Sequence, residues 1–179
     1  MALPDYRLLF HILESERSIL SRTDQKAFTL LSILGVFMVF FIVYYRYLLL
    51  NNFIVALIPI YFLAAFLSIY NLFRTIMPRF SRKQTEDDDE DHARDPTFFG
   101  GIRKFPTSAE YHAYMESIGA DEERTARLLS RQIHALAIIN WNKNIHLRRG
   151  MYFFITAIGT ELLMIVSLFI RMGLDSIAK

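Results

Sequence analysis

The chain has 179 residues, of which 53% are hydrophobic, and its formal net charge is only +2. So small a charge argues against a nucleic-acid-binding protein, because such proteins carry a concentrated basic surface. The sequence has no cysteine, which excludes disulfide bonds, thiolate metal ligands and a cysteine nucleophile. The hydrophobic residues fall into three blocks separated by charged segments, and this pattern predicts an all-α integral membrane protein with three transmembrane helices.

Residues 1–26 are predicted to form a cytosolic N-terminal helix. Leu9, Ile12 and Leu13 recur with further apolar residues at helical spacing, and charged residues occupy the positions between them. Neither glycine nor proline separates this segment from the first apolar block. We therefore expect one helix to continue from the cytosol into the membrane.

Residues 27–77 are predicted to form a transmembrane hairpin of two spans. Each span supplies about 20 mostly apolar residues, the length that crosses a bilayer core of about 30 Å. Asn51-Asn52 marks the turn between them. Tyr44, Tyr45 and Tyr47 stand beside that turn, as expected for the aromatic belt at a membrane surface.

Residues 78–104 are predicted to be a charged cytosolic linker. Their centre is the acidic run 86–91, in which like charges repel one another and resist burial. A Ca²⁺ or Mg²⁺ site is the less favoured interpretation, because the central glycine and terminal glutamate of an EF-hand loop are missing. We therefore expect a solvated linker and no bound metal.

Residues 105–149 are predicted to form a cytosolic helical region. Thr107 and Glu110 have the spacing of a capping box at the start of a short helix. Gly119 is a natural stop for that helix, and Asp121 can cap the next one.

The third transmembrane helix is predicted at residues 150–172, followed by a short external tail at 173–179. The helix that begins near Asp121 meets no glycine or proline before Gly150, so we expect it to continue into this span. Basic residues gather before the first span, after the second and before the third. By the positive-inside rule, the N-terminus and the large central loop are cytosolic.

Glu161 is the most unusual residue of the third span. A charged side chain at the centre of a transmembrane helix costs on the order of 3 kcal/mol, so this one needs a partner or a function. The small residues Ala157, Gly159 and Thr160 beside it predict close helix packing. One interpretation is a protonated glutamate that holds helices together; the other is a role in a conducting or membrane-opening oligomer. The predicted partner is water, a hydroxyl group or Glu161 of another subunit.

The second half of the helix 121–149 is rich in amide and basic side chains. One interpretation is a bundle helix whose polar residues set its register. The other is a pocket for a small anionic ligand, in which an aromatic ring stacks on the ligand and a basic group meets a phosphate. The residues that we predict for this pocket are Arg131, Asn140, Trp141 and Lys143.

Motifs that would indicate catalysis are missing from the sequence. It has no P-loop lysine motif, no GxSxG nucleophile turn and no dinucleotide-binding fingerprint. We therefore predict no catalytic residues and a protein that is not an enzyme.

Several short motifs follow one another along the chain: Asp24-Gln25-Lys26-Ala27, Pro78-Arg79, Phe98-Phe99-Gly100, Ser108-Ala109-Glu110-Tyr111, the polar helix from Leu129 to Lys143, and Leu147-Arg148. Taken in this order, they resemble those of a known family, the transmembrane effectors of bacterial Pycsar anti-phage systems. The resemblance implies that a neighbouring cyclase makes cyclic CMP or cyclic UMP on infection, and that the effector responds by compromising the inner membrane, so that the cell dies before phage matures.

The sequence thus predicts a homo-oligomeric effector of the bacterial inner membrane, with a small cytosolic helical bundle continuous with spans one and three. Its partners are the lipid bilayer and, through a small-molecule product, a pyrimidine nucleotide cyclase; no nucleic acid is expected. Two alternatives remain open. One is a membrane-anchored scaffold in which the acidic run and Phe98–Gly101 dock a protein. The other is a small ion channel unrelated to defence.

Overall fold

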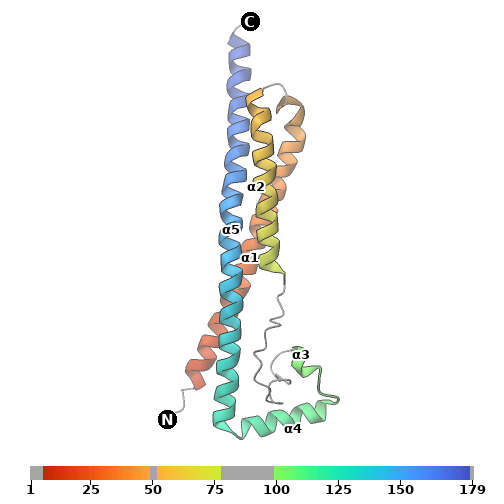
Figure 1. Cartoon of the computed structure of the whole chain (residues 1–179), viewed down its shortest axis with the longest axis vertical. Helices are drawn as coiled ribbons and strands as arrows, with labels where there is room; N and C mark the ends of the chain where they lie inside the picture. The colour runs from red at the N-terminus through yellow and green to blue at the C-terminus, as the bar shows by residue number, and fades with distance from the viewer. Residues whose placement is uncertain (1–5, 49–51, 78–98, 178–179) are drawn as a thin grey trace. The chain divides into compact units, whose positions relative to one another are not determined.

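The computed structural model describes residues 6–48, 52–77 and 99–177. All secondary structure in these residues is helical, which confirms the prediction of an all-α protein. The helices are α1 (Tyr6–Leu48), α2 (Asn52–Ile76), α3 (Phe99–Ile102), α4 (Ser108–Gly119) and α5 (Glu122–Ile177) (Figure 1).

Three of the helices, α1, α2 and α5, are long and apolar enough to cross a membrane, which confirms the predicted number of apolar helices. As expected, α1 is unbroken from Tyr6 to Leu48, and α5 continues through Gly150. The cytosolic position of the segments outside the spans stays a prediction, as do the domain boundaries. Several predicted features lie outside the described residues: the acidic run 86–91, Pro78-Arg79, Phe98 and Asn51.

The chain divides into two compact units, and α1 and α5 contribute residues to both. The first unit contains residues up to Arg17 and from Arg79 to Ile139; the second contains Ser18–Pro78 and everything from Asn140 onward. The membrane-type apolar core lies in the second unit, and the short helices α3 and α4 lie in the first.

Buried positions along the long helices recur at alternating steps of three and four residues. An average repeat of 3.5 residues is that of helices that wrap around one another with a left-handed supercoil. The stripe is most regular on α5, where it comprises the buried residues Ala126, Leu129, Asn140, Lys143, Leu147, Gly150, Ala157, Glu161 and Met164 and the half-buried residues Ile133, Leu136 and Phe154. Four of its members are polar or glycine, so the stripe is not a purely apolar seam.

In the second unit α1 and α5 run parallel to each other, and α2 runs antiparallel to both. Ala27 of α1, Leu72 of α2 and Leu147 of α5 form one buried cluster. Further along α1, Phe41 stacks on Tyr61 of α2, with ring centroids 5.2 Å apart. Residue numbers on α2 therefore fall as those on α1 rise, which is the antiparallel arrangement expected of a short hairpin.

Helices α2 and α5 pack closely at Gly150. The hydroxyl of Ser68 donates a hydrogen bond to the Gly150 carbonyl oxygen at 3.1 Å. A Cβ atom at Gly150 would lie 2.9 Å from the Leu72 side chain. A glycine is therefore required here for the two helices to pack at this distance.

In the first unit α1 packs on the N-terminal part of α5. Leu9 and Leu13 of α1 are buried against Ala126 and Leu129 of α5. The hydroxyl of Tyr6 donates a hydrogen bond to the backbone carbonyl of Glu122 in the first turn of α5. These apolar contacts, together with the Tyr6 hydrogen bond at their end, therefore hold α1 and α5 in register.

The start of α4 follows the predicted capping box only in part. The Glu110 amide donates to Thr107 Oγ1 at 3.2 Å, which confirms the N-cap. The Glu110 carboxylate, however, accepts a hydrogen bond from the Thr107 hydroxyl rather than from its amide. The reason is that both side chains meet outside the helix, and this contact satisfies the hydroxyl.

The turn between α4 and α5 also corrects one prediction. Gly119 is the last residue of α4 rather than a left-handed cap, and Ala120 is the C-cap in a right-handed conformation. The chain enters α5 at once, because Asp121 caps it by accepting from the Arg124 amide at 3.1 Å. The predicted role of Asp121 is therefore confirmed.

Candidate functional site

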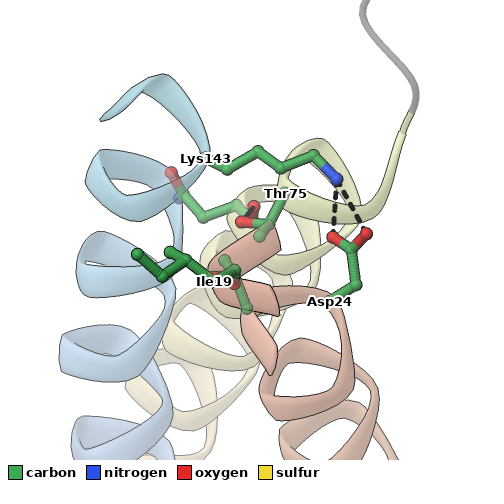
Figure 2. A network of polar contacts seen from close by, with 6 residues as sticks. Ile19, Asp24, Thr75 and Lys143 are labelled. Carbon is green, nitrogen blue, oxygen red and sulfur yellow. Dashed lines mark hydrogen bonds and ion pairs between the residues drawn. The ribbon is translucent and has the colours of Figure 1, made fainter. Parts of the chain in front are cut away.

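A partly buried ion pair joins α1 to α5 in the second unit. Lys143 Nζ lies 2.6 and 2.9 Å from the two carboxylate oxygens of Asp24. The Lys143 side chain is 8% exposed and that of Asp24 is 31% exposed. Figure 2 shows the lysine on α5 reaching across to the aspartate on α1. Charge-assisted hydrogen bonds of this length are among the strongest in proteins.

Other polar side chains around the ion pair are satisfied within their own helices. Thr23 Oγ1 donates to the Ile19 carbonyl at 2.8 Å. Thr75 Oγ1 donates to the Asn71 carbonyl at 3.1 Å (Figure 2). Because these hydroxyls bond to the preceding helical turn, they add polarity to the buried face without linking helices. The Asp24–Lys143 pair, in contrast, connects two helices.

The structure separates the four residues that the sequence suggested for an anion pocket. Asn140 and Lys143 lie on the buried stripe of α5. Trp141 is 70% exposed. As the residue after Asn140, it points about 100° away from the buried stripe around the axis of α5. Arg131 is exposed and belongs to the first unit. Ligand binding by these residues stays a prediction, and an anion at Lys143 would have to compete with Asp24.

Sequence reasoning did not identify Asp24 as a partner, although it appears in the motif at the start of the first span. It lies 119 residues from Lys143, and no local spacing connects the two. The signal that was present is the three–four stripe, which passes through Thr23 and Ala27 on α1 and through Lys143 on α5. A charged side chain on or beside a buried stripe is destabilising unless an opposite charge on a facing helix pairs with it.

Glu161 lies inside the second unit and is only 2% exposed. The hydroxyl of Tyr61 on α2 lies beside its carboxyl group. Within the described residues, neither carboxylate oxygen nor the tyrosine hydroxyl completes a hydrogen bond of good geometry. A hydroxyl, one of the partners predicted for Glu161, thus lies beside the carboxyl group, which remains incompletely satisfied within the described residues.

The small residues next to Glu161 do not behave alike. Ala157 and Thr160 are buried, as close packing requires. Gly159 is exposed, and a Cβ atom there would meet nothing within 4 Å. Within this chain Gly159 therefore makes no close helix contact, whereas Gly150 does; packing of Gly159 against another subunit stays a prediction.

The first unit contains a cavity of about 520 Å³ between α1, α4 and α5. Most of its wall is apolar, and its polar groups come from α1 and α5. Its lining residues are Phe10, Leu13, Glu14, Arg17, Met115, Ile118, Gly119, Thr125, Leu128, Leu129 and Gln132. Across the described helices, no three His, Asp or Glu side chains gather so as to hold a metal ion.

A family model described as the Pycsar effector protein domain matches residues 8–171. The matched range includes both partners of the partly buried ion pair, the cavity of the first unit and Glu161. No curated protein and no solved structure matches the chain.

Proposed function

This chain belongs to the Pycsar effector family, and on that premise we propose that it responds to a cyclic pyrimidine nucleotide and impairs the bacterial inner membrane. The nucleotide, cyclic CMP or cyclic UMP, is made by a partner cyclase during phage infection. The response causes abortive infection, in which the infected cell dies before phage is released.

The observation that carries this proposal is that α1 and α5 each belong to both compact units. One unit offers a cavity between helices, and the other consists of three apolar helices that enclose polar side chains. A ligand that prefers one packing of α1 against α5 in the first unit would shift the equilibrium between resting and active states. The change reaches the second unit because the same two helices continue into it.

We propose that the active state is a homo-oligomer. In the apolar stretches of α1, α2 and α5, the share buried inside the chain is only 17%, 28% and 22%. Most of the surface of these stretches therefore faces outward, where lipid or further copies can pack. Glu161 and Lys143 would then supply polar groups to a pathway that opens when helices separate.

A liposome assay tests the proposal. Purified full-length protein is reconstituted into dye-loaded vesicles and mixed with cyclic CMP, cyclic UMP, cyclic AMP or buffer. We expect dye release with one of the pyrimidine nucleotides and little with buffer or cyclic AMP. Equal release in every condition would refute nucleotide control. Ion flux without dye release, unaffected by nucleotide, would favour the small channel instead.

The proposed orientation places the N-terminus and the central loop in the cytosol. Because the sequence has no cysteine, single cysteines report sidedness without background. In intact spheroplasts, an impermeant thiol reagent should label Leu174→Cys and leave Ser108→Cys unlabelled until the membrane is opened. Labelling of Ser108→Cys from outside would reverse the proposed topology.

A further inference from the structure

We propose that the cavity of the first unit is the nucleotide site, with Arg17 binding the cyclic phosphate, Glu14 the ribose hydroxyl and Gln132 the base. This inference rests on the proposed function, and it places the ligand away from the four residues that the sequence suggested. The cavity volume of about 520 Å³ lies within the range of about 300–1,000 Å³ typical of small-molecule sites.

Arg17 and Glu14 are available for a ligand. They lie one turn apart on α1, a spacing at which opposite charges commonly form an ion pair. Within the described residues, however, no ion pair and no side-chain hydrogen bond engages either of them. Both instead line the cavity.

The chemistry of the polar groups matches the parts of a cyclic mononucleotide. A guanidinium group donates two parallel hydrogen bonds to phosphate oxygens. A carboxylate accepts from a hydroxyl such as the ribose 2′-OH. The Gln132 amide offers both a donor and an acceptor, so it can meet the edge of cytosine or of uracil. These three groups thus cover the anionic, sugar and base portions of the ligand.

The apolar wall suits a stacked base. Leu13, Met115 and Ile118 come from α1 and α4, and Leu128 and Leu129 from α5. Another polar lining group, the Thr125 hydroxyl, already donates to the Ile118 carbonyl at 2.9 Å. The free polar groups are therefore confined to α1 and α5, the two helices whose packing a ligand must change.

The test is calorimetry of full-length protein in detergent with cyclic CMP and cyclic UMP. Arg17→Ala should weaken binding of the preferred nucleotide about tenfold or more, the loss expected for a hydrogen-bonded charge contact. Arg17→Lys should weaken binding less, because charge remains and the bidentate geometry is lost. Gln132→Leu should reduce the preference for pyrimidine over purine cyclic nucleotides.

Arg22→Ala is the matched control, because Arg22 is an exposed arginine of the same helix that does not line the cavity. It should leave affinity unchanged, and the melting temperatures of all variants should match the wild type. If wild-type protein binds but Arg17→Ala and Gln132→Leu bind equally well, this site is refuted while the proposed function stands. If wild-type protein binds neither nucleotide, the proposed function itself fails.

Discussion

Loss of the Asp24–Lys143 ion pair should destabilise the second unit. The Lys143 side chain is only 8% exposed. Replacing Asp24 with Asn would leave its ammonium group beside a neutral amide. Removing one partner of a fully buried pair costs about 3–5 kcal/mol, whereas a fully exposed pair contributes about 0.2–1 kcal/mol. Asp24 is 31% exposed, which places this pair between the limits. We expect a loss of about 2 kcal/mol in the free energy of unfolding.

A double-mutant cycle in detergent measures this energy. The variants are Asp24→Asn, Lys143→Met and the two together, followed by circular dichroism during reversible denaturation. The double variant should lose less stability than the sum of the single variants, because it leaves no unpaired buried charge. We expect a coupling energy of about 1–2 kcal/mol.

The chain provides its own control for this cycle. Glu123 and Arg127 form an ion pair one turn apart on α5, with side chains 73% and 61% exposed. An exposed pair of this spacing should show a coupling of about 0.3–0.5 kcal/mol. The reasoning is refuted if the Asp24–Lys143 coupling is no larger than that of the control pair.

Three further predictions follow from the packing. Gly150→Ala should destabilise the protein by about 1–3 kcal/mol in thermal denaturation, because its Cβ would lie 2.9 Å from Leu72. Gly159→Ala meets open space inside a helix, so it should stabilise the protein by up to about 1 kcal/mol in the same measurement. Glu161→Leu should raise the melting temperature, because it removes a buried carboxyl group with incomplete hydrogen bonding. The same variant should abolish nucleotide-dependent dye release. Full dye release would show that Glu161 has a structural role only. Thr107→Ala should destabilise the start of α4 by about 1 kcal/mol, seen as faster amide exchange confined to that helix, and unchanged exchange would show that the cap contributes nothing.

The long helices could be predicted because their signals are local. An uninterrupted apolar run of membrane length fixes a helix whatever it packs against. The absence of glycine and proline between Tyr6 and Ala27 indicated that α1 would not break. The same holds for α5 up to Gly150. Capping was predictable for the same reason, since Asp121 acts on an amide three residues away.

Pairwise contacts could not be predicted, because they depend on which faces meet in space. Asp24 on α1 and Lys143 on α5 are 119 residues apart. Their helices meet only because α2 runs antiparallel to α1 and α5 then packs against both. The two glycines of the third span illustrate the same limit. Gly150 and Gly159 look alike in sequence, yet one faces Leu72 and the other faces outward.

The sequence by itself determined the class of the protein, its three apolar helices, their continuity and the family to which it belongs, because these depend on composition and on spacing along the chain. Only the tertiary structure decided which polar side chains are buried together, which glycine permits close packing, and where a cavity forms among α1, α4 and α5. These features depend on the rotation of each helix about its axis. That rotation is set by how all the side chains of a unit pack at once.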